Sequence, residues 1–159
     1  MHLEIVTVGK LKERYLKQGV EEYLKRLSPY ARVDIVEIPE EKPSGSLTAA
    51  EIIRIKEREG ERILNRLHPG AHVIALAIEG KALSSEEMAE YMDRLATYGQ
   101  SRISFIIGGS VGLSPDVLRN ADFLLSVSRM TFPHQLMRLI LLEQLYRSFK
   151  IMRGETYHK

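Results

Sequence analysis

The chain has 159 residues, of which 44% are hydrophobic, so we expect a single domain over residues 1–159 with a substantial core. It contains no cysteine, which excludes disulfides, zinc–thiolate sites and thiol catalysis. The net charge of +2 is unevenly spread: residues 37–61 carry seven acidic and four basic residues, whereas residues 129–159 carry six basic and two acidic ones.

Strand and helix patterns alternate along the whole chain. Strands are predicted where β-branched and apolar residues run for five to seven positions, and helices where apolar residues recur every three or four positions. In chain order the predicted elements are a strand over 3–8, a helix within 12–30 that Pro29 ends, a strand over 33–38, a helix from Thr48 to about Leu67, a strand over 72–78, a helix after Ser84, a strand over 103–107, a short helix after Ser114, a strand over 122–128 and a helix from about Pro133 to Lys150.

Three of these helices have recognisable starting residues. Thr48 with Glu51, and Ser84 with Glu87, have the spacing of capping boxes, in which two side chains satisfy each other's backbone N–H groups. Ser114 precedes a proline, which is a favoured first residue of a helix.

The alternation predicts an α/β fold with a mostly parallel sheet and helices on both faces. Ligands of such sheets bind beyond the carboxyl ends of the strands, which points to the loops after Ile78, Ile107 and Ser128. No apolar run is long enough to cross a membrane, and the first residues lack the pattern of a signal peptide, so we expect a cytoplasmic protein. The five histidines lack metal-ligand spacing, so we expect no metal.

Three glycines follow the strand 103–107, in the stretch FIIGGSVGL. Ile107 occupies the position of the first glycine of GxGxxG, so the dinucleotide fingerprint is incomplete, and no Walker motif is present. Gly108 to Gly112 does satisfy GxSxG, which leaves a serine hydrolase with Ser110 as nucleophile open. Its partners would be one aspartate and one histidine among Asp116, Asp122, His134 and His158.

A third interpretation is a cleft that binds a nucleoside through main-chain groups and apolar walls. The three loops carry few charges, namely Glu79, Lys81 and Arg129. S-adenosylmethionine combines an adenine with a methionine moiety that carries one carboxylate, and would suit such a cleft. From the residues alone, this remains one possibility beside the hydrolase.

Three stretches carry a resemblance to a known family: TVGKLKERY, FIIGGSVGL and SVSRMTFPHQLMRLILLEQLYRSFKIMRGETYHK. They resemble the ribosomal RNA large subunit methyltransferase H family of the SPOUT class, over nearly the whole chain. The resemblance implies a SPOUT-type fold with a C-terminal trefoil knot. It also implies S-adenosylmethionine-dependent methylation of nitrogen-3 of a pseudouridine in helix 69 of 23S rRNA, on the assembled ribosome and by a homodimer.

The resemblance also implies site residues. The implied cofactor-binding residues are Leu76, Gly108, Val127, Ser128, Arg129, Met130, Thr131 and Phe132. The implied catalytic residues lie at the C-terminal end: His158 as proton acceptor, Arg147 to stabilise an anion or hold a phosphate, and Tyr157 to contact the base.

The last predicted helix bears on partners. It is apolar on more than one side, which indicates cover on several sides and fits a homodimer. Two basic segments, residues 129–159 and the cations Lys10, Lys12, Arg14 and Lys17, suggest a surface for RNA phosphates. The remaining alternative is therefore a non-catalytic RNA- or ribosome-binding protein with a vestigial pocket.

Overall fold

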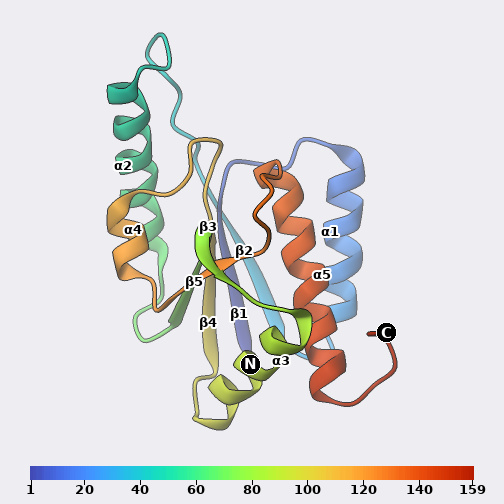
Figure 1. The fold of residues 1–159 in the computed structure, drawn as a ribbon. Coiled ribbons are helices and arrows are strands. Elements are labelled where there is room, and N and C mark those ends of the chain that lie inside the picture. Colours follow the sequence, from blue (N-terminus) through green and yellow to red (C-terminus); the bar gives the residue numbers. More distant parts are fainter.

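A computed structural model describes all 159 residues, and its helices and strands follow the predicted order (Figure 1). The strands are β1 (His2–Val8), β2 (Arg32–Ile38), β3 (His72–Ala82), β4 (Arg102–Ile107) and β5 (Phe123–Ser126). The helices are α1 (Arg14–Leu27), α2 (Ala49–Arg66), α3 (Ser85–Thr97), α4 (Pro115–Asn120) and α5 (His134–Met152). No helix is both long and apolar enough to span a bilayer.

The five strands form one sheet in the order β2-β1-β4-β3-β5, and every neighbouring pair is parallel. All five carboxyl ends therefore lie at one edge of the sheet. The predicted α/β class with a parallel sheet is confirmed. The trefoil knot implied by the family resemblance stays a prediction.

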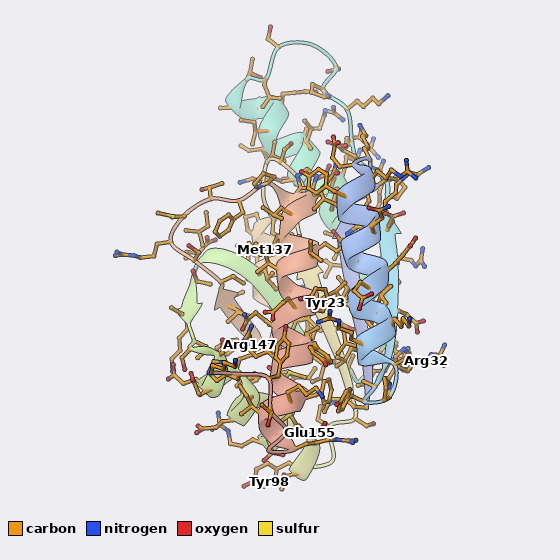
Figure 2. The ribbon with its side chains drawn as sticks, turned by 90° about the vertical axis from the view of Figure 1, so that its right-hand side faces the viewer. Tyr23, Arg32, Tyr98, Met137, Arg147 and Glu155 are labelled. Atoms are coloured by element: carbon orange, nitrogen blue, oxygen red, sulfur yellow. The ribbon has the colours of Figure 1, made fainter.

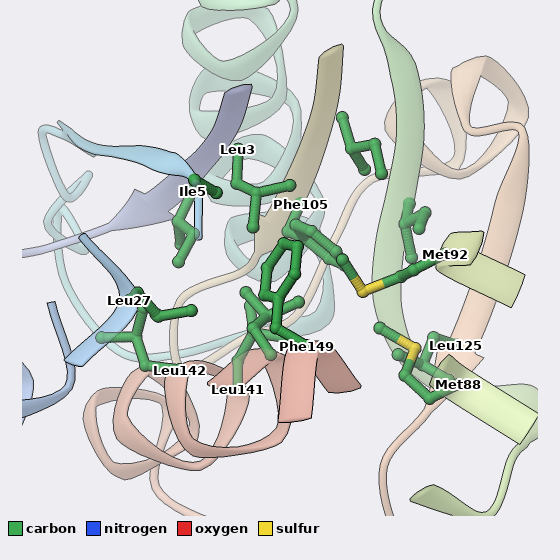
Figure 3. Close-up of a cluster of buried hydrophobic side chains, with 14 of the residues drawn as sticks. Leu3, Ile5, Leu27, Met88, Met92, Phe105, Leu125, Leu141, Leu142 and Phe149 are labelled. Carbon is green, nitrogen blue, oxygen red and sulfur yellow. The ribbon is translucent and has the colours of Figure 1, made fainter. Parts of the chain in front are cut away.

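Helices cover both faces of the sheet, as predicted, because alternate side chains of the buried strands point to opposite sides. On one face Leu3 and Ile5 of β1 join the larger cluster of 16 buried residues, which α1, α3 and α5 complete (Figure 3). On the other face Val6 and Val8 pack with α2 and α4 in a cluster of 8. This second cluster includes Val117 of the short helix.

The end of β3 differs from the prediction. The strand was expected to end at Ile78 but continues to Ala82, with a shift of register against β5 between Leu76 and Lys81. Gly80 lies in this irregular part, where a Cβ would come within 2.6 Å of the Leu124 carbonyl oxygen. The glycine allows this close backbone approach, and the extended strand forms one side of the site described below.

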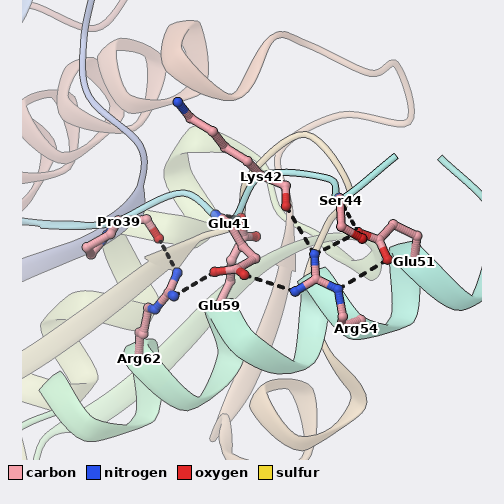
Figure 4. A network of polar contacts seen from close by, with 8 residues as sticks. All are labelled: Pro39, Glu41, Lys42, Ser44, Glu51, Arg54, Glu59 and Arg62. Atoms are coloured by element: carbon pink, nitrogen blue, oxygen red, sulfur yellow. Dashed lines mark hydrogen bonds and ion pairs between the residues drawn. The ribbon is translucent and has the colours of Figure 1, made fainter. Parts of the chain in front are cut away.

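The helix starts are mostly as predicted. Ser84 and Glu87 form a complete capping box, and Ser114 accepts a hydrogen bond from the N–H of Val117. The box predicted at Thr48 is wrong in one half: the Thr48 hydroxyl accepts from the N–H of Glu51, but the Glu51 carboxylate turns to Arg54 and Ser44 (Figure 4). An ion-paired hydrogen bond to an arginine is stronger than a neutral one, and this contact is the main cause that lowers the pKa of Glu51 to about 2.

Candidate functional site

The carboxyl ends of β3, β4 and β5 border a cleft of about 740 Å³. Three segments line most of it: residues 76–79 of β3, residues 107–113 after β4, and residues 127–134 before α5, apart from residue 129. These segments adjoin the three places that the sequence selected, although the residues after Ile78 continue β3 and do not form the expected loop. The parallel sheet brings them together, although they are far apart along the chain.

Seven of the eight residues implied for cofactor binding line this cleft, namely Leu76, Gly108, Val127, Ser128, Met130, Thr131 and Phe132. The eighth, Arg129, is exposed and is not among the lining residues. The loop between β5 and α5 is stabilised by two hydrogen bonds between residues two positions apart. The Ser126 hydroxyl donates to the Ser128 carbonyl at 3.1 Å, and the Ser128 hydroxyl accepts from the N–H of Met130 at 2.9 Å.

The glycine turn after β4 folds back closely on itself. A Cβ on Gly108 would lie 2.9 Å from the Leu113 side chain and 3.1 Å from the carbonyl carbon of Gly112. Gly112 has a φ of +88°, a conformation that side chains rarely adopt. The turn can therefore present its bare backbone to the cleft only with glycines at these positions.

The cleft is largely apolar and weakly charged. Ile78 and Met130 on its rim are 52% and 73% exposed and present apolar surface to the opening. Its charged lining residues are Glu79 and Lys56, and neither forms an ion pair. His134 also lines it, and burial lowers the pKa of this imidazole, which favours its neutral form. Such walls suit a ligand with apolar and neutral hydrogen-bonding parts.

Lys56 was not found by reasoning on the sequence. It projects from α2 to the glycine turn, where a Cβ on Gly112 would lie 3.9 Å from its Cε. Nothing in the local sequence of α2 distinguishes it from the other basic residues of that helix.

A serine protease-like triad is not assembled around Ser110. This serine lines the cleft, is exposed and makes no side-chain hydrogen bond. Asp116 pairs with an arginine three residues later, and Asp122 accepts from a backbone N–H of β3 at 2.8 Å. His158 lies among other partners, described below, and His134 contacts neither aspartate. The geometry gives the hydrolase alternative no support.

The three residues implied for catalysis lie together beside the second half of α5, and Glu143 connects two of them. Arg147 donates two hydrogen bonds to Glu143, at 2.7 and 3.3 Å, and the Tyr157 hydroxyl donates a third at 2.7 Å. The guanidinium carbon lies 4.8 Å from the centre of the Tyr157 ring. The bond to Glu143 raises the pKa of Arg147, and burial raises that of Tyr157, so the arginine stays charged and the phenol stays neutral.

His158 has a partner on each ring nitrogen. Arg147 Nη1 lies 3.0 Å from Nδ1, and Glu86 Oε1 of α3 lies 2.5 Å from Nε2. Since an arginine only donates, Nδ1 accepts and Nε2 carries the proton that is donated to Glu86. This contact is the main cause that lowers the pKa of Glu86. We call these five residues the tail cluster: Glu86, Glu143, Arg147, Tyr157 and His158.

Reasoning on the sequence missed the two carboxylates of the tail cluster. Glu143 stands four residues before Arg147 on α5, a spacing at which helical side chains meet, so it could have been found. Glu86 is 72 residues from His158 in sequence, and only the tertiary structure brings them together.

The tail cluster and the cleft of the same chain are separate. None of the five residues lines the cleft. Met137 of α5 does, and Arg147 follows it by ten residues, which is about 15 Å along a helix axis (Figure 2). No group of three or more histidine, aspartate or glutamate side chains is arranged to hold a metal ion.

The known proteins that are similar to this chain are named as methyltransferases or methylases. The family described as "Predicted SPOUT methyltransferase" matches residues 1–158. The chain is 60% identical, over the full length of both proteins, to proteins named Ribosomal RNA large subunit methyltransferase H from Bacillus thuringiensis subsp. konkukian and from Bacillus pumilus. A methylase-family protein of known structure from Neisseria gonorrhoeae is similar in fold, with a TM-score of 0.50 at 10% identity over 91% of this chain and 81% of that one.

Proposed function

This chain belongs to the SPOUT methyltransferase family, and we propose that it methylates nitrogen-3 of a pseudouridine in helix 69 of 23S rRNA, with S-adenosylmethionine as methyl donor. The proposal is supported by full-length identity of 60% to proteins named for large-subunit rRNA methylation. The pseudouridine, its helix, the assembled ribosome and the donor follow from the family resemblance. We propose that the enzyme acts in the cytoplasm, because its proposed substrate is the ribosome.

The observation that carries the proposal is the cleft at the strand ends. Its volume of about 740 Å³ falls within the range of roughly 300–1,000 Å³ typical of cofactor sites. Its apolar walls and bare glycine turn fit an adenine and a methionine moiety. The cofactor would be held by Leu76, Gly108, Val127, Ser128, Met130, Thr131 and Phe132, with Arg129 at the rim. When bound, it supplies a methyl carbon already activated by a sulfonium leaving group.

The chain's own residues then have two tasks, to align the base and to take its proton. The ring nitrogen of the base is mostly protonated near neutral pH. If the His158 ring moves away from Arg147, its Nδ1 lone pair becomes free to accept that proton, while Nε2–H still donates to Glu86. Arg147 is then released to face the developing negative charge. Tyr157, whose hydroxyl is held by Glu143 and whose ring packs against Tyr146 and Arg147, would turn away from these partners to contact the base.

We further propose that the enzyme works as a homodimer whose chain threads the trefoil knot of its family. The separation of about 15 Å along α5 between Met137 at the cleft and Arg147 of the tail cluster supports this proposal. A second copy could bring its tail cluster to the first copy's cleft. Four apolar side chains of α5 remain partly exposed and could be covered by it: Leu136, Met137, Leu139 and Ile140.

The test is transfer of labelled methyl groups to purified ribosomes that lack the modification, followed by mapping of the labelled nucleotide. We expect label at one pseudouridine of 23S rRNA. Label elsewhere, or none, would refute the proposed reaction. Binding to ribosomes with no transfer, and no heat on titration with S-adenosylmethionine, would instead identify a non-catalytic binder.

His158→Ala tests the role of the tail. We expect a loss of 100-fold or more in kcat with unchanged affinity for S-adenosylmethionine, because the histidine lies outside the cleft. Full activity of this variant would exclude His158 as the proton acceptor.

A further inference from the structure

We infer that the start of α1 and the loop before it form a surface that binds the substrate RNA beside the cleft, through its phosphates and one unpaired base. We call this surface the basic loop. It consists of the loop residues Lys10 and Lys12 and of three residues in the first turn of α1, namely Arg14, Tyr15 and Lys17. The inference rests on the proposed function, since it names how the RNA of that reaction is held.

The cations of the basic loop are free. All four are exposed, none forms an ion pair, and Glu13 is the only acidic residue among them. The C-terminal segment, which the sequence also suggested for phosphates, is different. Arg138 is only 2% exposed and bonded to Glu37. Arg147 and Lys150 are paired with glutamates of the same chain. Lys56 and Arg129 at the cleft are also unpaired, and the basic loop adds four free cations beside them.

The loop backbone is fixed against the start of α5. Gly9, with a φ of +90°, turns the chain, and its carbonyl accepts a hydrogen bond from the buried Arg138 at 3.2 Å. The N–H of Lys12 donates to the Gln135 side chain at 3.3 Å. Figure 1 shows the β1–α1 connection passing beside the first turn of α5. A loop already held in place loses less conformational entropy when it binds.

This anchoring puts the basic loop next to the cleft. A Cβ on Gly9 would lie 3.7 Å from Nε2 of His134, and His134 lines the cleft. Lys10 follows Gly9 directly. RNA phosphates on the loop would therefore lie beside the opening through which the target base must enter.

Tyr15 adds a second, independent feature. Its ring is 67% exposed and forms none of the aromatic contacts found elsewhere in the chain. An exposed ring among free cations is typical of surfaces that bind single-stranded RNA, where bases stack on aromatic side chains.

RNA fits this surface better than a second copy of the chain. A two-fold contact of the loop with itself would bring like charges together. Contact with the acidic segment 37–61 of another copy would join two different surfaces, and such contacts lead to rings or open filaments rather than closed dimers.

The first experiment removes the charges. The variant carries Lys10→Gln, Lys12→Gln, Arg14→Gln and Lys17→Gln. The matched control removes four exposed, unpaired cations elsewhere: Lys25→Gln, Arg58→Gln, Arg66→Gln and Arg94→Gln. Affinity for 70S ribosomes is measured against KCl concentration. Since each phosphate contact contributes about 0.7 to 0.9 to the log–log salt slope, we expect the variant's slope to be shallower by about 3. The control should resemble the wild type.

In methyl transfer we expect the KM for ribosomes to rise 10- to 100-fold in the variant, with the affinity for S-adenosylmethionine unchanged. Equal salt slopes for variant and control would overturn the inference. Ribosome binding and methyl transfer are measured separately. If the wild type binds ribosomes through this loop but transfers no methyl group, the proposed reaction is wrong and the inference about the RNA-binding surface still holds.

The second experiment addresses Tyr15. Tyr15→Phe keeps a ring for stacking, whereas Tyr15→Ala removes it. We expect about a tenfold rise in the ribosome KM for the alanine variant only. Sedimentation velocity is run on both variants. If Tyr15→Ala dissociates the protein into monomers, or if its KM stays at the wild-type value, the ring does not serve RNA and the inference for Tyr15 is wrong.

Discussion

Glu59 of α2 is 3% exposed, yet only one of its carboxylate oxygens has a hydrogen-bond partner. Its Oε2 accepts from the backbone N–H of Glu41 at 3.0 Å, beside the arginines that hold the same loop (Figure 4). Its Oε1 has no partner and lies 3.2 Å from the place of a Cβ on Gly109. Burial raises the pKa of this carboxyl, since the charged form loses its hydration.

Glu59→Gln is predicted to stabilise the protein at neutral pH. A raised pKa means that the folded state binds the proton more tightly than the unfolded state. The contribution of this proton to the free energy of unfolding is complete below the ordinary pKa of a glutamate and is lost as pH rises through the raised pKa. Glutamine keeps the acceptor for Glu41 and removes the buried charge. We expect a gain of roughly 1 kcal/mol at pH 7 that vanishes near pH 4, measured by urea unfolding. Equal stability at pH 7 would contradict this.

Gly108→Ala is predicted to weaken binding of S-adenosylmethionine at least tenfold. The new Cβ would meet both the Leu113 side chain and the backbone of Gly112, so the turn must shift at the cleft wall. Gly45→Ala is the matched control, because nothing lies within 4 Å of its Cβ position. Calorimetric titration measures both variants. Wild-type affinity in the Gly108 variant would mean that the turn does not shape the cofactor site.

At the scale of elements, the sequence predicted what local patterns determine. The caps at Ser84 and Ser114 depend on residues three positions apart, and both are present. The extension of β3 escaped prediction, because Gly80 reads as a turn until the neighbouring strand is known to pass so closely. At Thr48 the local rule failed because Arg54 competes for the Glu51 carboxylate.

The candidate site likewise has parts that local sequence patterns predict and parts that depend on the tertiary structure. The cleft could be predicted, since parallel strands must end at one edge of the sheet. The contact of His158 with Glu86 depends on how the tail crosses α3, and no local pattern encodes it. Arg138 looked like a surface cation, and only the tertiary structure shows that it is buried and bonded to Glu37 and the Gly9 carbonyl.

The residues after α5, 153–159, are held against this helix by Glu155. Its carboxylate accepts hydrogen bonds from the Tyr30 hydroxyl at 3.0 Å and from Lys150 at 3.1 Å, and Lys150 is the main cause that lowers the pKa of Glu155. A lowered pKa means that this fastening is present above the ordinary pKa of a glutamate and is lost as pH falls through the lowered value. Glu155 thus acts as a positioning residue for Tyr157 and His158.

Glu155→Ala is predicted to lower kcat about tenfold while the affinity for S-adenosylmethionine stays unchanged, because the tail loses its position but the cleft does not change. Tyr30→Phe removes one of the two hydrogen bonds and should have a smaller effect in the same direction. Methyl transfer to ribosomes and calorimetry separate the two quantities. A wild-type kcat in the alanine variant would show that the tail needs no such fastening.

At the scale of the whole molecule, one helix links the two halves of the proposed site. The first turns of α5 carry Met137 at the cleft, and a later turn carries Arg147 of the tail cluster (Figure 2). A rigid helix cannot fold these ends together. Since the base must reach both a methyl donor and a proton acceptor, a tail from a second copy is the simplest arrangement that joins them.

Subunit complementation tests this arrangement. One variant, Gly108→Val, is expected to have a disabled cleft and an intact tail; the other, Arg147→Ala with His158→Ala, an intact cleft and a disabled tail. Each alone should be inactive. If tails act across a two-fold dimer, each mixed dimer contains one cleft and one tail that are both intact and meet. With free exchange, half of the dimers are mixed and each has one working site of two, so an equal mixture should recover about a quarter of the wild-type activity. If each tail serves its own chain, every site in the mixture carries a defect, and the activity stays at the level of the separate variants.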